Sequence, residues 1–191
     1  AFADMPDELA RVLAEAKGFE PYVKQDPKRP PNSQLGLAGN PAWSAFFLVK
    51  EGVATPGAGQ CPKTLAALKD APLARIDGRA PSILFSRLAP GARIPPHNGM
   101  INTRLICHLP LIVPPNCGLR VGNEVRFWEE ARAWVFDDTI EHEAWNGSNA
   151  ERTVLIFDIW RPDIDEDERR AINVLCQAID SFGGGGGDGD A

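Results

Sequence analysis

The chain has 191 residues, of which 43% are hydrophobic, so it can bury one sizeable core but is short for two domains. A net charge of −6 and the lack of any basic block argue against a nucleic-acid-binding protein, because phosphate contacts need clustered Lys and Arg. No apolar run reaches the ~20 residues that span a bilayer and no secretory signal pattern opens the chain, so we expect a cytoplasmic protein without membrane contacts.

The N-terminal part, residues 1–80, is predicted to be helical and irregular. Residues 7–17 place apolar side chains on one face of a short helix. Residues 19–42 are rich in Pro, Asn, Gly and Lys and predict an irregular segment, while 43–50 (WSAFFLVK) predict a buried strand or a short helix. A proline suited to a first helical turn indicates a second helix over 61–72.

From residue 81 to 162 the pattern changes to short apolar runs separated by turn signals such as APGA, PPNCG and NGSN. The runs are, in order, SILFSRL, TRLICHLPLIV, GLRV, VRFW, AWVF, HEAW and RTVLIFDIW. Because no helical pattern separates them, they predict an antiparallel sandwich or barrel, and so a mainly β fold.

Residues 163–181 predict a C-terminal helix with acidic residues at its start. Its apolar face, expected to dock on the core, is formed by Ile172, Leu175, Cys176 and Ile179. Residues 183–191 are rich in Gly and predict a flexible tail, so a single domain should occupy 1–182. Cysteines without CxxC spacing predict reduced, packed thiols at Cys61, Cys107, Cys117 and Cys176.

The chain has three histidines, His97, His108 and His142, and all lie in the strand-rich region. His97 and His142 each stand at the start of a predicted strand, and two strand starts can converge at one end of a sandwich. Imidazole is a ligand for iron and for zinc. A single His in a strand is more often a hydrogen-bonded core residue, so these residues alone also allow a metal-free sandwich with three core histidines.

Two arginines, Arg104 and Arg152, lie inside runs that should form buried strands. An unpaired buried charge is costly, so each needs either an acidic partner within the protein or a ligand. For Arg104 a ligand-binding role and a salt bridge to Glu141 or Asp158 have equal weight.

Three segments of the chain, SRLAPGARIPPHNGMINTRLICHLPLIVP, FDDTIEHEAWN and RTVLIFDIWRP, resemble the aspartyl/asparaginyl β-hydroxylase family in sequence and in order. The members are Fe(II)- and 2-oxoglutarate-dependent oxygenases with a double-stranded β-helix, or jelly-roll, core. In that family two histidines hold the metal, and a glycine stands where related oxygenases carry a carboxylate ligand, as Gly99 does here. The match separates this chain from the commoner oxygenases with two histidines and one carboxylate.

The resemblance implies that His97 and His142 hold Fe(II). Arg152, helped by the Ser86 hydroxyl, would bind the distal carboxylate of 2-oxoglutarate, since a guanidinium offers a planar fork to a carboxylate. His108 would contact the cosubstrate near its metal-bound end.

Two further positions qualify this assignment. The family pattern R-L-R-x-H-L reads RLICHL here, so Ile106 replaces an expected arginine. Arg104, two residues earlier on the same face of the strand, is the candidate to contact the cosubstrate in its place. Asp138, four residues before His142, would lie in the second shell and hold a metal-bound water.

The expected activity is O2-dependent hydroxylation of an aliphatic C–H bond. The family name implies the β-carbon of Asp or Asn, in a peptide, a small molecule or a carrier-bound substrate. An iron halogenase is an alternative, because a small residue such as Gly99 can admit chloride. A cupin-like metal-binding or isomerase protein is another: GARIPPH and HEAWN fit the ends of the cupin motif, although the second His of its H-x-H pair is absent.

Overall fold

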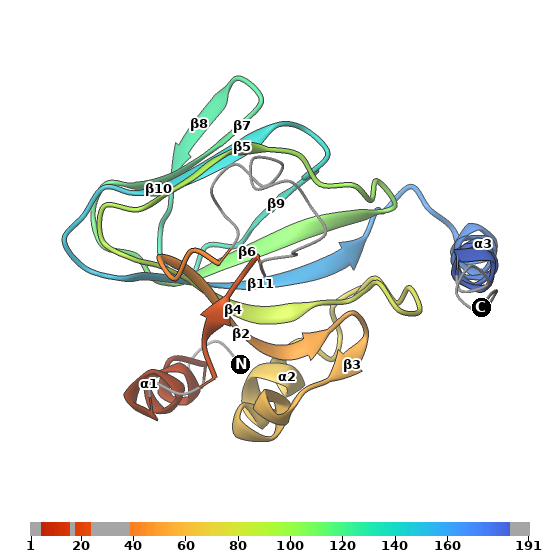
Figure 1. The fold of residues 1–191 in the computed structure, drawn as a ribbon, viewed down its shortest axis with the longest axis horizontal. Helices are drawn as coiled ribbons and strands as arrows, with labels where there is room; N and C mark the ends of the chain where they lie inside the picture. Colours follow the sequence, from red (N-terminus) through yellow and green to blue (C-terminus); the bar gives the residue numbers. More distant parts are fainter. Residues whose placement is uncertain (1–4, 16–17, 24–38, 184–191) are drawn as a thin grey trace, which may run out of the picture.

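Two antiparallel β-sheets pack face to face in a computed structural model, which describes residues 5–15, 18–23 and 39–183 (Figure 1). The larger sheet consists of β1 (Glu20–Pro21), β2 (Trp43–Lys50), β3 (Val53–Ala54), β4 (Ile83–Leu88), β6 (Arg104–Ile112), β9 (Trp134–Phe136) and β11 (Arg152–Trp160). Its order is β1-β2-β4-β11-β6-β9, with β3 beside β2. The smaller sheet, ordered β5-β10-β7-β8, consists of β5 (Arg93–His97), β7 (Cys117–Val121), β8 (Glu124–Phe127) and β10 (His142–Asn146). The fold is therefore mainly β, of the jelly-roll class, as the sequence predicted.

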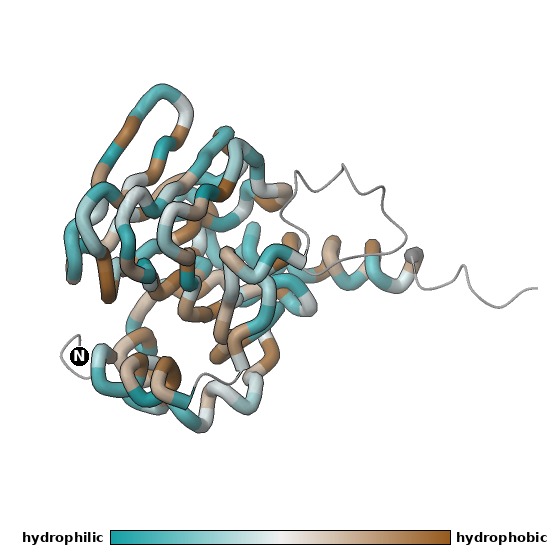
Figure 2. Tube along the Cα trace, turned by 60° about the vertical axis from the view of Figure 1, so that its left-hand side comes forward, coloured by the Kyte–Doolittle hydropathy of each residue, from teal (hydrophilic) through white to brown (hydrophobic). Residues whose placement is uncertain are grey.

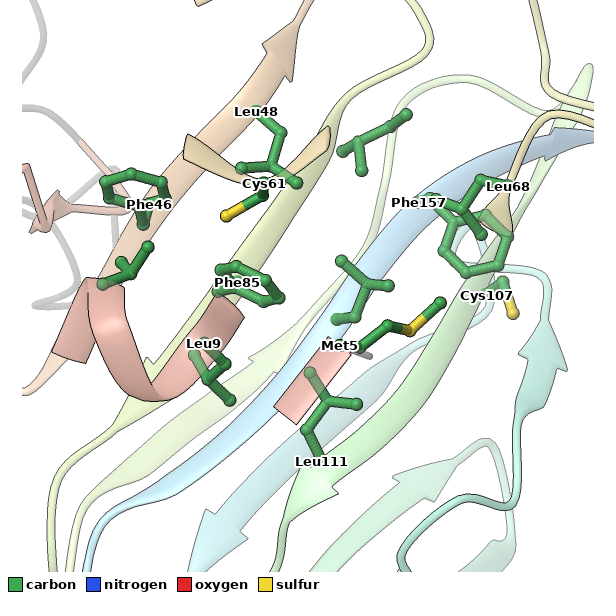
Figure 3. Close-up of a cluster of buried hydrophobic side chains, with 13 residues drawn as sticks. Met5, Leu9, Phe46, Leu48, Cys61, Leu68, Phe85, Cys107, Leu111 and Phe157 are labelled. Carbon is green, nitrogen blue, oxygen red and sulfur yellow. The ribbon is translucent and has the colours of Figure 1, made fainter. Parts of the chain in front are cut away.

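Helices α1 (Met5–Glu15) and α2 (Pro62–Ala67), with the short 3₁₀ helix η3 (Pro56–Gln60), lie on the outer face of the larger sheet. Figure 3 shows Met5 and Leu9 of α1 packed over Phe85 and Leu111 of that sheet. Because side chains alternate along a strand, Phe85 faces the helices while Ser86 faces the smaller sheet. The largest apolar cluster thus lies in the outer layer, and the space between the sheets holds polar groups beside a second apolar cluster.

A buried carboxylate joins the two N-terminal helices. Glu8 of α1, 1% exposed, accepts hydrogen bonds from the backbone N–H of Lys63 (2.9 Å) and Thr64 (2.8 Å) and from the Thr64 hydroxyl (2.8 Å), at the start of α2. Burial by itself would raise the pKa of Glu8, but these hydrogen bonds outweigh it, so the pKa lies below its usual value. The carboxylate therefore satisfies N–H groups that the first turn of α2 leaves without partners.

Several local predictions change in the structure. Residues 43–50, placed by the sequence in the N-terminal part outside the core, form β2 and pair with β4, so the larger sheet begins before residue 81. Nothing local reveals this pairing, since its partner is distant in sequence. The helix predicted over 61–72 ends at Ala67. His97, predicted to start a strand, is instead the last residue of β5, since Pro95 and Pro96 lie within this edge strand. The Gly-rich tail, and most of the irregular segment between β1 and β2, fall outside the described residues.

The C-terminal helix α3 (Glu166–Gly183) extends away from the sheets, with hydrophilic and hydrophobic positions alternating along it (Figure 2). Of the predicted docking face, Ile172 and Cys176 pack against the cluster formed by Ala74, Ile76, Ala80 and Trp160, whereas Leu175 and Ile179 are 60% and 52% exposed, so the docking face is shifted from the predicted one. Asn173 sets that face: its amide donates to the carbonyl of Arg75 (3.0 Å) and its oxygen accepts from the N–H of Asp77 (2.9 Å). Polar contacts of this kind are invisible to an apolar periodicity.

All four cysteines are free thiols, and three of them are buried, as expected. None of the helices in the described part of the chain combines the length and hydropathy that crossing a bilayer requires.

The Glu8 contact gives a stability prediction. Glu8→Gln should lower the free energy of unfolding by about 2 kcal/mol at neutral pH, because a charge-assisted acceptor of buried N–H groups is lost. Because the pKa of Glu8 is lower in the folded than in the unfolded state, this stabilisation should be fully present at pH values above the unfolded pKa of 4.5. It should disappear as the pH falls through the lower pKa of the folded state. Urea unfolding from neutral to acid pH would measure it. Glu15→Gln, an exposed change on the same helix, is the control, and equal losses in both variants would contradict the assignment.

Candidate active site

A cavity of about 510 Å³ lies between the two sheets, and all seven site residues predicted from the sequence line it. They come from five strands of the two sheets and from the turn before β10: Ser86, His97, Arg104, His108, Asp138, His142 and Arg152. Residues spread over much of the chain therefore converge on one space.

His97 and His142 form a cross-strand pair. The antiparallel register of β5 and β10 sets them directly opposite each other, with ring centroids 4.1 Å apart. Nδ1 of His97 lies 2.8 Å from the carbonyl oxygen of Pro95, and Nδ1 of His142 lies 3.0 Å from that of Ile140. A carbonyl oxygen only accepts, so each Nδ1 carries the proton and each Nε2 keeps a free lone pair.

Burial keeps two of the imidazoles neutral. It lowers the pKa of His142, with a further contribution from the neighbouring His97. It also holds the pKa of His108 well below its ordinary value, reinforced by the charge of Arg152. Neutral imidazole is the form that binds a metal ion, so the site suits metal binding at neutral pH.

Gly99 lies against the Asp138 carboxylate. The N–H of Gly99 donates to the carbonyl of Asp138 (2.6 Å), and a Cβ built on Gly99 would overlap the Asp138 carboxylate. Within the described residues, no group of three or more His, Cys, Asp or Glu side chains forms a metal cluster. The space that a side chain at position 99 would occupy is thus already taken by a neighbouring acid.

Arg152 is a buried cation with unused donors. It is 1% exposed, and its guanidinium carbon lies 4.2 Å from the centre of the Trp128 ring. Its Nε and Nη1 have no hydrogen-bond partner among the described residues, and burial lowers its pKa to about 9. Nδ1 of His108, on the same cavity wall, is likewise without a partner in this part of the chain. Buried donors without partners are expensive, so this wall is built for an anionic or polar ligand.

Arg104, in contrast, is already paired. It forms ion pairs with Asp138 (3.2 Å) and Asp158 (3.3 Å). The salt bridge to Asp158 was one of the two alternatives for this residue, whereas Glu141 instead pairs with Arg120 (2.9 Å). Burial raises the pKa of Asp158 and the charge of Arg104 opposes that rise, so the pair limits the cost of burying both groups.

Sequence reasoning missed the aromatic walls of the cavity. Trp43 of β2 donates from Nε1 to the Ser86 oxygen (3.1 Å) and stacks on Tyr22, with ring centroids 4.2 Å apart. Since this oxygen accepts from Trp43, the Ser86 hydroxyl hydrogen is free to donate to a ligand. No sequence signal links β2 to Ser86, and Trp128 beneath Arg152 gave none either.

Asn146 fixes the turn after β10 and also ties distant strands together. Its amide nitrogen donates to the carbonyls of Leu88 (3.0 Å), Ala89 (3.1 Å) and Ala150 (2.8 Å), and its oxygen accepts from the N–H of Ser148 (3.1 Å). The side chain is 1% exposed. The end of β10 is therefore anchored to β4 and β11 of the facing sheet.

The contact between Gly99 and Asp138 predicts a strong coupling. Gly99→Ala should cost about 1–3 kcal/mol of unfolding free energy because the added methyl overlaps the carboxylate, and most of that cost should disappear in an Asp138→Ala background. A double-mutant cycle by chemical denaturation would measure the coupling. Gly59→Ala, where an added Cβ meets nothing within 4 Å, is the control. Additive effects at 99 and 138 would contradict the geometry.

The chain was compared with known proteins. The sequence profile described as Aspartyl/Asparaginyl beta-hydroxylase matches residues 1–162. Aspartyl/asparaginyl beta-hydroxylase from Mus musculus is 37% identical over 172 residues, covering 88% of this chain and 22% of that protein. Ornithine lipid ester-linked acyl 2-hydroxylase from Rhizobium tropici is 41% identical over 124 residues, covering 63% of this chain and 42% of that protein. The chain thus spans less than half the length of either relative.

Among solved structures, a Cupin 2 conserved barrel domain protein from Salinispora arenicola has a TM-score of 0.42 at 10% identity, covering 79% of this chain and 99% of that chain.

Proposed function

Since the chain belongs to the aspartyl/asparaginyl β-hydroxylase family, we propose that it is an Fe(II)- and 2-oxoglutarate-dependent dioxygenase that hydroxylates an aliphatic C–H bond. One observation carries the proposal: two histidines whose Nε2 atoms keep a free lone pair share a cavity with buried Arg152, whose Nε and Nη1 have no hydrogen-bond partner among the described residues. The first group fits a metal ion and the second fits a carboxylate.

In this proposal His97 and His142 hold the iron through Nε2. Their Nδ1 hydrogen bonds to backbone carbonyls fix the tautomer and the ring orientation, as partners of metal-bound histidines commonly do. When bound, the iron supplies the activation of O2 that protein side chains cannot provide. Asp138, against Gly99, would accept a hydrogen bond from a metal-bound water rather than act as a ligand.

Arg152 and Ser86 then orient the cosubstrate. The guanidinium of Arg152 would bind the distal carboxylate of 2-oxoglutarate, and the negative charge of this carboxylate would compensate the buried positive charge of Arg152. The Ser86 hydroxyl hydrogen would donate to the same carboxylate, while His108 would contact the opposite end. Ile106, where family members commonly have an arginine, forms an apolar part of the same wall and donates nothing.

The proposed site of hydroxylation is the β-carbon of an Asp or Asn residue or of a related amino-acid-type compound. The substrate that carries it would be a peptide, a small molecule or a carrier-bound form. The name of the Mus musculus relative supports this class, and the name of the Rhizobium tropici relative adds a lipid acyl chain as a second source of aliphatic C–H bonds. A halogenase has less support, because the Asp138 carboxylate beside Gly99 repels the chloride that would have to bind there.

The histidine pair gives the central test. His97→Ala and His142→Ala should each abolish the visible absorption band that Fe(II) and 2-oxoglutarate produce together without oxygen, and should reduce succinate formation at least a hundredfold. Glu129→Gln, an exposed change away from the cavity, is the control. Succinate production at the wild-type rate in either histidine variant would refute the metal assignment.

Two ligands that differ in the distal carboxylate can test the contact of Arg152 with that group. Arg152→Lys should weaken binding of the inert analogue N-oxalylglycine at least tenfold, because a single ammonium cannot replace a bidentate fork. Calorimetry in the presence of Mn(II) would measure it. Pyruvate, which lacks the distal carboxylate, is the matched ligand, and its affinity should change little. If the affinities for both ligands fell equally, Arg152 would not contact the distal carboxylate.

A further inference from the structure

The two sheets leave an open seam on one side of the sandwich. β8 is the edge strand of the smaller sheet and β9 that of the larger sheet. Between them lies a second cavity of about 330 Å³, here called the seam pocket. Its apolar walls are formed by Leu119, Val121, Trp134, Val135, Phe136 and Ile140.

The seam pocket adjoins the candidate active site. Leu119 and Phe136 line both cavities, one from each sheet. The Phe136 ring lies 5.3 Å from the ring of His142 and 5.0 Å from that of His108, measured between centroids. The shared wall of Leu119 and Phe136 therefore brings a group in the seam pocket close to His142 and His108.

The lining selects an aliphatic ligand. The charged residues at the rim, Glu124 and Arg126, pair with each other at 2.7 Å and are largely exposed, whereas the interior of the pocket is apolar. Val135 and Ile140 are each 49% exposed, and a hydrocarbon chain would remove this surface from water. Each buried methylene contributes about 0.8 kcal/mol, and the volume is near the lower limit for small-molecule pockets.

We propose that the seam pocket binds an unbranched aliphatic chain that is the apolar part of the substrate, with the reacting C–H bond next to His97 and His142. Its assignment to the substrate rests on the proposed function, but its affinity for an aliphatic chain does not. An extended peptide fits the seam less well, since β8 and β9 offer only 4 and 3 residues for strand pairing.

The first test uses linear primary alcohols from butanol to decanol and the iron-free protein. Affinity, followed by shifts of Ile, Leu and Val methyl resonances, should rise about fourfold per methylene until the pocket is full. Ile140→Asp and Val135→Asp, both at the exposed rim, should remove this dependence on chain length. Val125→Asp is the matched control, because Val125 is 54% exposed on β8 but does not line the pocket.

An affinity that does not depend on chain length would overturn the proposal, as would an equal loss in Val125→Asp. Peptide binding that protects the β8 and β9 amides, without alcohol binding, would also overturn it and assign the seam to strand pairing. His97→Ala should still bind the alcohols while it loses succinate formation. Alcohol binding thus tests the seam pocket, and succinate formation tests the proposed function, independently of each other.

A second test links the chain to turnover. With N-acyl-L-aspartates from acetyl to decanoyl, kcat/KM for succinate formation should rise with acyl length in the wild type and in Val125→Asp, but not in Ile140→Asp. Equal kcat/KM values across the series in the wild type would show that the aliphatic chain is not part of the substrate. Absence of succinate with every member, in a protein that still binds the alcohols, would contradict the amino-acid part of the proposed function and leave the pocket assignment standing.

Discussion

The antiparallel pairing of β5 with β10 is the constraint on which the candidate site depends. It sets His97 opposite His142 at the mouth of the sandwich, and the ladder is irregular just past this pair, where the prolines of β5 lack N–H groups. A shift of one residue would send one imidazole to the outer face of the sheet. The anchor at Asn146, at the far end of β10, opposes such a shift by tying the strand to the facing sheet.

Two arginines that line the cavity, Arg104 and Arg152, differ in how their charges are compensated. Arg104 forms ion pairs with Asp138 and Asp158, so its charge is offset within the protein. Arg152 instead has an aromatic ring below it and keeps two nitrogen donors without partners among the described residues. Leaving such donors unpaired lowers the stability of the fold when no ligand is bound, and a ligand that pairs with them would regain this free energy. The outer core of helices and sheet, fastened by Glu8, supplies the stability that this arrangement needs.

The sequence predicts well what repeats locally or matches a family motif. The runs of β4, β6, β10 and β11 are recognisable because both faces are buried, and the family motif brought seven residues that do share one cavity. Sequence reasoning fails where the decisive contact is distant or polar. β2 pairs with a strand far along the chain, and the contacts of Asn173 shift the docking face of α3, so that only Ile172 and Cys176 of its predicted apolar face pack on the core. The aromatic partners Trp43 and Trp128 were missed for the same reason, since only the fold brings each beside its polar group.

The Asn146 anchor also bears on the chemical ageing of the protein. Asn followed by Gly is the sequence most prone to deamidation, because the unhindered glycine nitrogen attacks the side-chain carbonyl carbon to close a succinimide ring. Here three carbonyl oxygens hold the Asn146 amide, and the Gly147 N–H is bound to the carbonyl of Asn116 at 3.0 Å. Ring closure would require breaking these bonds, so Asn146 outlasts the same dipeptide in an open loop. Conversion of Asn146 to Asp would place a carboxylate against three carbonyl oxygens. Deamidation at this one position would therefore destabilise the fold.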